Sequence, residues 1–197
     1  MTANLSTDQA SDHDLWVFGY GSLMWRPGFD FIERVQARLI GEHRSLCVYS
    51  FVHRGTPEKP GLVLGLDRGG ACRGIAYRVA AAKRDETIAY LRDREQVTAV
   101  YREVTRSVWL ENSERARISA ITYAVDRSHA QYAGKLTLAE QLRFVRQGHG
   151  RSGINSDYVI STVTAIEQLG FRDEPLHRLA EMLRTQTHSP PAENTGV

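Results

Sequence analysis

A carboxylate near the end of the first predicted helix is the side chain best suited to acid–base chemistry. Hydrophobic spacing predicts a helix over 83–97, and Glu95 lies four residues after Leu91 and seven after Ile88. It therefore shares a face with the apolar stripe. Burial raises the pKa of a carboxyl group, which suits a general base that works near neutrality. A structural ion pair is about as good an interpretation, and the candidate partners are Arg92, Arg94 and Arg102.

A glycine-rich turn ends the first apolar run of the chain. The segment Leu15–Phe29 reads LWVFGYGSLMWRPGF, with glycines at 19 and 21. Glycine lets the backbone approach a ligand closely, and successive amides in such a turn can form an anion-binding nest. Ser22 adds a hydroxyl donor, so a small carboxylate would fit. On spacing alone, a tight strand-exit turn without a ligand is the favoured interpretation.

Motifs for several other chemistries fail in this sequence. A dinucleotide fingerprint needs Gly or Ala at the sixth position and a helix after the turn, but Met24 stands there and Pro27-Gly28 breaks the helix. There is no Gly-x-Ser-x-Gly elbow. Cys47 and Cys72 lack any metal-ligand spacing and are expected to be two buried thiols in a reducing compartment. With the histidines scattered, we expect no metal.

Two further charged residues have both a functional and a plain interpretation. Arg54 stands in the turn-rich segment HRGTPEKPG and could bind a substrate through its guanidinium, although such a segment is more often a simple loop. Glu86 lies nine residues before Glu95, about 180° around an ideal helix. It is therefore expected to be a solvated surface acid.

Composition limits the class of protein. The 197 residues are 42% hydrophobic and 24% charged, with a formal net charge of +2, which describes one globular domain with a substantial core. Charges of both signs are interspersed, so no nucleic-acid groove is predicted. No window reaches the roughly 18 apolar residues of a membrane span, and the first residues lack the features of a secretory signal. We expect a cytoplasmic location.

The spacing of hydrophobic residues changes along the chain and indicates which elements position these residues. Alternating or continuous apolar patterns predict strands, and amphipathic patterns predict helices. Strands are expected at 15–20, 34–43, 45–53, 61–67, 72–80, 101–110 and 115–125, with the 83–97 helix between the fifth and the sixth. This order is not a regular strand–helix alternation. It indicates an α+β fold with a largely antiparallel, barrel-like sheet and helices outside it.

The last third of the chain is expected to be helical. Thr137 and Glu140 form a capping box, Asn155 or Ser156 can cap a second helix, and Asp173 with Pro175 starts a third. The predicted organisation is a disordered arm at 1–13, a single domain at 14–184 and a disordered tail at 185–197.

A resemblance to a known family extends over most of the chain. VFGYGSLMWRPGF (17–29) resembles the signature of the ChaC-type γ-glutamylcyclotransferases. Similar segments follow in order: HRGTPEKPGLVLGL (53–66), GIAYRV (74–79), YLRDREQVTAVY (90–101) and GRSGINSDYV (150–159). The likeness covers about 15–170, and the first and fourth segments are the specific ones.

The resemblance implies a fold and an activity. The family has a compact mixed α/β barrel-like domain and cleaves the γ-glutamyl bond of glutathione, which releases 5-oxoproline and cysteinylglycine without a cofactor. Its catalytic glutamate matches Glu95. Its substrate-binding turn matches Tyr20, Gly21, Ser22 and Leu23, and further family positions match Glu86, Tyr101 and Tyr158.

One departure and two alternatives stay open. Many members have a glycine just before the tyrosine where this chain has TAVY, so Ala99 and Val100 could narrow the cleft or alter its loop. The first alternative is a cyclotransferase for other γ-glutamyl amines or amino acids. The second is a non-catalytic regulatory binding protein, because the family was long labelled as regulating cation transport. The oligomeric state is not predicted.

Overall fold

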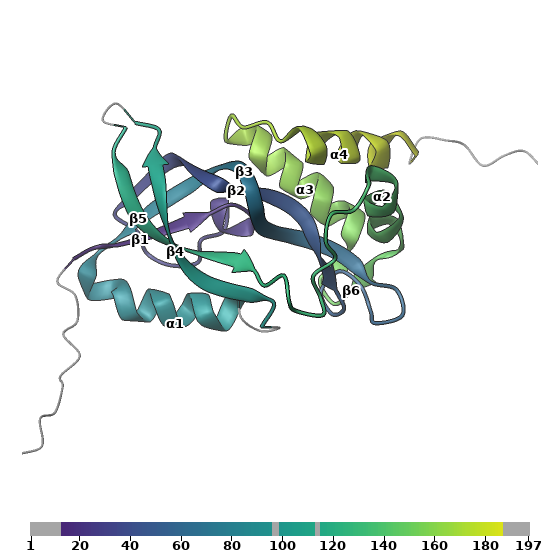
Figure 1. The fold of residues 1–197 in the computed structure, drawn as a ribbon, viewed down its shortest axis with the longest axis horizontal. Helices are drawn as coiled ribbons and strands as arrows, with labels where there is room; N and C mark the ends of the chain where they lie inside the picture. The colour runs from purple at the N-terminus through teal and green to yellow at the C-terminus, as the bar shows by residue number, and fades with distance from the viewer. Residues whose placement is uncertain (1–12, 96–98, 113–114, 187–197) are drawn as a thin grey trace, which may run out of the picture.

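A closed barrel of five strands forms the centre of the molecule (Figure 1). This computed structural model describes residues 13–95, 99–112 and 115–186. The barrel order is β1-β3-β2-β4-β5, and every pairing is antiparallel except the parallel contact between β1 and β5. The strands are β1 (Leu15–Gly19), β2 (Glu33–Ser50), β3 (Gly61–Val79), β4 (Tyr101–Leu110) and β5 (Arg117–Val125). The expected largely antiparallel barrel is confirmed.

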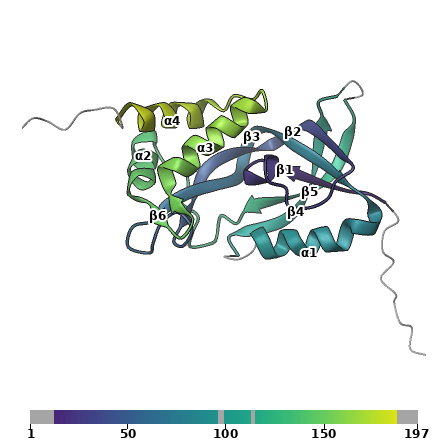
Figure 2. The ribbon, with the colours of Figure 1, turned by 180° about the vertical axis from the view of Figure 1, so that it is seen from behind.

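Helices cover the barrel on two sides, as both ribbon views show (Figures 1 and 2). The helix α1 (Arg84–Glu95) runs along one side, after a short 3-10 turn η2 (Ala81–Lys83). On the other side lie α2 (Leu138–Gln147), α3 (Asn155–Gln168) and α4 (Glu174–Gln186). A second 3-10 turn, η1 (Ser22–Met24), follows β1, and a small hairpin of β6 (His149–Gly150) and β7 (Gly153–Ile154) precedes α3.

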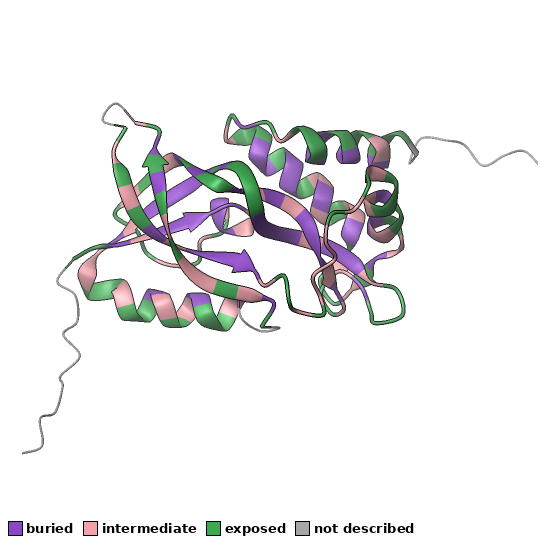
Figure 3. Ribbon diagram, viewed as in Figure 1, coloured by how far each residue is buried: buried purple, intermediate pink, exposed green. Residues whose placement is uncertain are grey.

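Buried residues lie along the barrel strands and on the helix faces turned towards the barrel (Figure 3). The largest cluster joins the barrel interior to α2, α3 and α4, and includes Phe18, Leu39, Val163 and Leu179. A smaller cluster packs Leu91 of α1 against the barrel. The two helical layers are therefore attached to one continuous barrel rather than to each other.

The long hairpin of β2 and β3 differs from the predicted pairs of shorter strands. The two strands predicted at 34–43 and 45–53 are one strand, β2, and those predicted at 61–67 and 72–80 are one strand, β3. Both predicted interruptions are therefore wrong. Gly69 and Gly70 adopt positive φ angles of 98° and 71°, which bend β3 without ending its pairing with β2. Arg44 interrupts the alternation of β2 but is buried in an ion pair, so the strand continues through it. β2 then ends at Ser50, short of the predicted 53.

The helix boundaries test the predicted caps. The capping box at Thr137 is confirmed, because its hydroxyl accepts from the Glu140 amide and the Glu140 carboxylate accepts from the Thr137 amide. The cap predicted at Asn155 or Ser156 is wrong, since the N-cap of α3 is Ile154 without a side-chain bond. At the other end of the domain, α4 extends to Gln186, two residues past the predicted limit.

Some predicted segments lie outside the described residues, and other expectations concern the chain as a whole. The predicted arm, apart from His13, and the tail beyond Gln186 lie outside the described residues, as do the last two residues of the predicted 83–97 helix. Cys47 and Cys72 are free and buried, as expected. In the described part of the chain, no helix has the length and apolar character needed to cross a membrane.

Candidate active site

An open stretch of strand edge on β3 creates the candidate site. β1 pairs only with the C-terminal part of β3, so the backbone at Leu62 and Leu64 meets side chains instead of a strand. Asn155 accepts from the Leu62 amide and donates to its carbonyl, at 2.7 and 2.8 Å. Tyr101 donates to the Leu64 carbonyl at 2.6 Å, and the Leu64 amide donates to the Tyr158 hydroxyl at 3.3 Å. Residues from β4 and α3 thus replace a neighbouring strand.

A small polar pocket lies against this edge, which we call the inner pocket. Its volume is about 80 Å³. It is lined by Tyr20, Gly21, Ser22, Leu23, Leu64, Glu95, Tyr101, Tyr123 and Tyr158. The lining combines the glycine-rich turn after β1 with the carboxylate at the end of α1, so the two features singled out in the sequence meet in one cavity.

Glu95 presents a half-desolvated carboxylate to the inner pocket. Its side chain is 19% exposed, and its Oε1 lies 3.3 Å from Nε of Arg94. Burial raises the pKa of Glu95 above the ordinary glutamate value, and the charge of Arg94 partly offsets the rise. Both interpretations of this residue therefore hold at once, because the acid has an ion-pair partner and a raised pKa. A raised pKa makes the carboxylate a stronger base than an exposed glutamate.

Tyrosine hydroxyls surround the carboxylate and stay protonated. Burial is the main cause that raises the pKa of Tyr20 and Tyr101 well above the usual value and that of Tyr158 to about 12. The proton of Tyr101 is engaged by the Leu64 carbonyl. Tyr158 accepts from the Leu64 amide, and the Thr162 side chain is a second neighbour of its hydroxyl. Unlike Tyr101, it does not donate to the Leu64 carbonyl. Tyr158 is therefore the better placed donor of the two.

The turn after β1 is a single 3-10 turn whose carbonyls face the protein. The amides of Met24 and Arg26 bond back to the carbonyls of Gly21 and Ser22, at 2.9 and 2.8 Å. The buried hydroxyl of Tyr77 donates to the next two carbonyls of the turn. The first amides of a helical turn have no partner within it, and here they belong to residues that line the inner pocket.

Arg94 ties the carboxylate to the turn. Its Nη2 donates to Oγ of Ser22 at 2.8 Å, and its Nη1 donates to the carbonyl of Arg26 at 2.7 Å. A third contact reaches the hydroxyl of Tyr90, one turn earlier on α1. Because Arg94 also pairs with Glu95, one side chain fixes the end of α1, the acid and the turn relative to one another.

A wider opening adjoins the inner pocket, which we call the outer cleft. Its volume is about 540 Å³, within the usual range for small-molecule sites. It shares Ser22, Glu95, Tyr101 and Tyr158 with the inner pocket. Its other lining residues are Trp25, Arg26, His53, Arg54, Val63, Arg94, Ser152, Asp157 and Ser161. The outer cleft thus brings several cations to the mouth of the inner pocket.

Arg54 occupies a fixed place in the outer cleft. Its guanidinium lies 5.2 Å from the centre of the Tyr158 ring and donates to the carbonyl of Ile154 at 3.3 Å. Gly61 and Gly148 pack so closely on the loop that a Cβ atom at either position would collide with the Arg54 carbonyl. The segment that carries Arg54 is therefore a packed loop rather than a free one.

Most of the residues singled out in the sequence come together. Tyr20, Gly21, Ser22, Leu23, Glu95, Tyr101 and Tyr158 line the inner pocket, and Arg54 lines the outer cleft. Sequence reasoning missed the positioning contacts of Arg94 and Asn155. The position of Arg94 four residues after Tyr90 was the one available signal for the first of these, and nothing in the sequence indicated that Asn155 bonds a strand edge.

Glu86 is not brought to the site. Its side chain is 72% exposed and pairs with Lys83 at 2.8 Å on the outer face of α1. It lines neither the inner pocket nor the outer cleft. The exposed position that helix geometry predicted for Glu86 is confirmed, and the lining of neither cavity supports the substrate-binding position that the resemblance implies.

Ala99 and Val100 do not narrow the cleft. Val100 is buried against Cys47, Val48 and Val125, and Ala99 is exposed. Ala99 adopts a φ of 54°, a conformation that favours glycine. The departure from the family pattern therefore places a strained residue in the connection between α1 and β4 instead of a bulkier wall.

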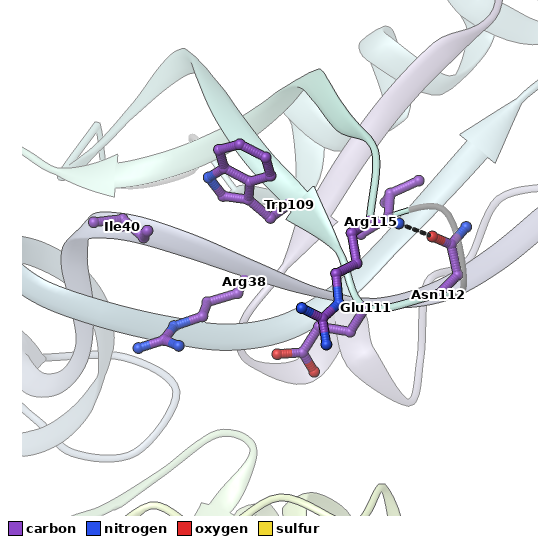
Figure 4. A pocket seen from close by; sticks show the side chains of 7 residues that line it. Arg38, Ile40, Trp109, Glu111, Asn112 and Arg115 are labelled. Atoms are coloured by element: carbon purple, nitrogen blue, oxygen red, sulfur yellow. Dashed lines mark hydrogen bonds between the residues drawn. The ribbon is translucent and has the colours of Figure 1, made fainter.

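A larger hollow lies away from these residues, between β2 and the start of the β4–β5 connection (Figure 4). Its volume is about 640 Å³, and Arg38, Ile40 and Trp109 line it. None of the residues predicted to act in catalysis or binding reaches it. Among the described residues, no three His, Cys, Asp or Glu side chains gather as a metal site would require. Size alone therefore does not identify the active site.

Known proteins resemble this chain over most of its length. The family model described as ChaC-like protein matches residues 15–186. A protein of Escherichia coli K12 named glutathione-specific γ-glutamylcyclotransferase is 31% identical over 84% of this chain and 71% of its own. The Arabidopsis thaliana γ-glutamylcyclotransferase 2-3 is 32% identical over 86% of this chain and 88% of its own.

A solved structure has the same fold. The selenomethionine-labelled crystal structure of a yeast γ-glutamyl cyclotransferase specific to glutathione superimposes with a TM-score of 0.79. The match covers 89% of this chain and 97% of the yeast chain, at 23% identity.

Proposed function

This chain belongs to the ChaC-like protein family, and we propose that it is a γ-glutamylcyclotransferase that cleaves glutathione to 5-oxoproline and cysteinylglycine. The observation that carries the proposal is the inner pocket, where a half-buried carboxylate of raised pKa lines the same cavity as a glycine-rich turn. The names of the bacterial and yeast relatives support glutathione as the substrate.

The inner pocket suits the glutamyl end of the substrate. The amides of the turn from Gly21 to Leu23 would bind the α-carboxylate. The α-ammonium on the same carbon then lies towards Glu95, because both groups of the protein line one small cavity. The inner pocket is small, about 80 Å³, and ring closure needs the glutamyl chain folded so that its amine meets its own γ-carbonyl carbon.

Glu95 carries protons from one nitrogen to the other. It takes a proton from the α-ammonium, and the freed amine attacks its own γ-carbonyl carbon. The new carbon–nitrogen bond closes the five-membered ring, and the old amide bond breaks as Glu95 protonates the departing nitrogen. In total two protons leave the α-nitrogen and two reach the leaving amine, so Glu95 returns to its starting state and no water is consumed.

Orientation supplies much of the rate in such a reaction. Well-oriented intramolecular groups reach effective molarities of about 10⁵ to 10⁸ M, so a single acid–base residue is sufficient. The oxyanion that develops on the γ-carbonyl needs a donor. Tyr158 is our candidate for this donor, because its hydroxyl accepts from the Leu64 amide and, unlike that of Tyr101, does not donate to the Leu64 carbonyl.

The outer cleft suits the leaving group. Cysteinylglycine ends in a carboxylate, and Arg54 places a cation in the cleft beside Tyr158. A cyclotransferase for other γ-glutamyl amines would use the same inner pocket with a different leaving group. The free, buried state of both cysteines fits a reducing compartment, which supports a cytoplasmic location.

Release of 5-oxoproline from glutathione, and from a panel of γ-glutamyl dipeptides and amines, tests the proposal. We expect release by the wild type, with glutathione preferred. Glu95→Gln keeps the shape of the side chain but removes the base, and we expect it to lower kcat by about 10²- to 10⁴-fold. Glu86→Gln is the matched control, because it changes an exposed acid on the same helix.

The outcomes separate the candidate functions. Release from other γ-glutamyl compounds, but not from glutathione, would keep the chemistry and change the substrate. Release that survives Glu95→Gln would remove Glu95 from the mechanism. If no compound yields 5-oxoproline, the enzyme proposal fails and the regulatory binding protein is left.

A further inference from the structure

A buried arginine on β2, Arg44, also contacts the glycine-rich turn, at atoms that Arg94 does not bind. The Arg44 side chain is 4% exposed. Its Nε donates to the carbonyl of Tyr20 at 2.5 Å, and its Nη2 donates to the carbonyl of Arg73 at 2.6 Å. Nη2 also lies 3.6 Å from the sulfur of Met24. Arg44 thus contacts residues on both sides of the turn that lines the inner pocket.

The charge of Arg44 is balanced from the helical layer. Its Nη1 pairs with Oδ2 of Asp173 at 2.9 Å, at the connection between α3 and α4. A buried charge without such a partner is strongly destabilising. The pair explains how the fold tolerates the cation, but it does not explain why Nε is directed at the carbonyl of Tyr20 in the turn.

The carbonyl that Arg44 binds belongs to a peptide group that can rotate. In a planar trans peptide the C=O and the following N–H point in opposite directions, so the Tyr20 carbonyl fixes the direction of the Gly21 amide. Gly21 has a φ of −125°, and a flip of the peptide plane would bring it to positive φ, which glycine adopts freely. A fixed partner for the Tyr20 carbonyl is therefore what selects one orientation.

We propose that Arg44 is a positioning residue for substrate binding: it holds the Tyr20–Gly21 peptide so that the Gly21 amide points into the inner pocket. The inference rests on the proposed function, since the amide is expected to meet the α-carboxylate of a γ-glutamyl substrate. Arg44 touches no reacting atom, because it lines neither the inner pocket nor the outer cleft. Its effect is on substrate affinity and leaves the proton transfer by Glu95 unchanged.

The test separates positioning from stability. Binding of glutathione is measured by calorimetry in a Glu95→Gln background, where turnover is suppressed, together with thermal unfolding. Arg44→Met leaves Asp173 unpaired and is expected to lower Tm. In the double variant Arg44→Met with Asp173→Asn no unpaired charge is left, so Tm recovers. We expect both variants to bind glutathione about tenfold or more weakly, because neither restores the bond to the Tyr20 carbonyl.

Two controls accompany these variants. Arg106→Met with Glu42→Gln removes another arginine–carboxylate pair, joined at 2.7 Å, which does not contact the turn. We expect this variant to bind glutathione as tightly as the Glu95→Gln protein from which it is made. Arg44→Lys keeps the charge but loses the planar fork that reaches several acceptors at once. We expect it to bind about as weakly as Arg44→Met.

Each result has one meaning. If the Arg44→Met, Asp173→Asn variant regains the Tm of the Glu95→Gln protein but still binds glutathione weakly, the proposal is supported. Recovery of both Tm and affinity in the double variant would show that Arg44 acts through stability alone, and would overturn the proposal. If the parent binds no glutathione, and the wild type releases no 5-oxoproline from any γ-glutamyl compound, the proposed function fails and this inference fails with it.

Discussion

The inner pocket and the outer cleft share a wall but differ in chemistry. The inner pocket, of about 80 Å³, is lined by hydroxyl groups, backbone and the single acid Glu95. The outer cleft, of about 540 Å³, adds Arg26, Arg54, Arg94 and Asp157. A small, rigid cavity suits the part of a substrate that reacts, and a wide, charged one suits a part that is only recognised. In the proposed enzyme, chemistry and leaving-group preference would therefore be separable by mutation.

The acid–base group of the inner pocket gives the largest expected effect. A general base acts in its deprotonated form, so kcat/KM should fall about tenfold for each pH unit below the pKa of Glu95. Burial raises that pKa above 4.5, so the acid limb of the pH–rate profile should lie above this value. Arg94→Gln removes the positive charge that lowers this pKa and should move the limb to higher pH.

Measuring the pH–rate profile with glutathione and with a second γ-glutamyl substrate sharpens the comparison between the inner pocket and the outer cleft. Both should give the same acid limb, because the inner pocket holds the same part of each. A limb at or below pH 4.5 in the wild type would contradict a desolvated base.

A methyl group added to the inner pocket should weaken every γ-glutamyl substrate alike. A Cβ on Gly21 would lie 3.7 Å from the nearest Leu64 carbon, an ordinary contact, so Gly21→Ala should fold. The methyl occupies space at the turn, and we expect KM to rise about tenfold or more. Gly19→Ala is the contrasting variant, because its Cβ would lie 2.9 Å from that of Leu23. It should lower Tm as well, and equal Tm values would contradict this distinction.

A change in the outer cleft should affect only some substrates. Arg54→Gln removes the cation beside Tyr158, and an exposed or half-exposed ion pair contributes on the order of 1 kcal/mol. We therefore expect KM for glutathione to rise several-fold while kcat is kept. A γ-glutamyl amine without a carboxylate in its leaving group should be unaffected, and Arg54→Lys should keep most of the affinity. An equal loss for both substrates would break the division between the two regions.

The smallest expected effect lies outside both regions. Ala99 adopts a φ of 54°, which costs an L-residue about 1 kcal/mol relative to glycine. Ala99→Gly should therefore raise the free energy of unfolding by up to about 1 kcal/mol, measured by denaturant titration, and leave KM unchanged. A change in KM would mean that the connection after α1 contributes to the cleft after all.

The parts of the fold that could be predicted are those governed by local patterns. The alternation in β4 and the capping box at Thr137 depend on neighbouring residues, and both predictions are confirmed. The break predicted in β2 was wrong because the contact that lets the strand continue is not local. Arg44 interrupts the alternation of β2, and its partner Asp173 lies 129 residues away.

The candidate site was predictable in part for the same reason. Helix periodicity placed Glu95 on the inner face of α1 and Glu86 on the outer one, and the structure agrees with both. The meeting of Glu95 with the turn was implied by the resemblance and not by periodicity. Asn155 looked like a helix cap, whereas its amide group bonds the edge of β3. Contacts across long stretches of sequence carry no periodic signal.

The open edge of β3 also bears on how the protein avoids self-association. An unpaired strand edge is a template on which another chain can add a strand, and natural proteins usually cover it. Here Asn155, Tyr101 and Tyr158 occupy the backbone groups of Leu62 and Leu64. These side chains therefore also deny the edge to a second chain, and we expect substitutions that remove them to favour aggregation.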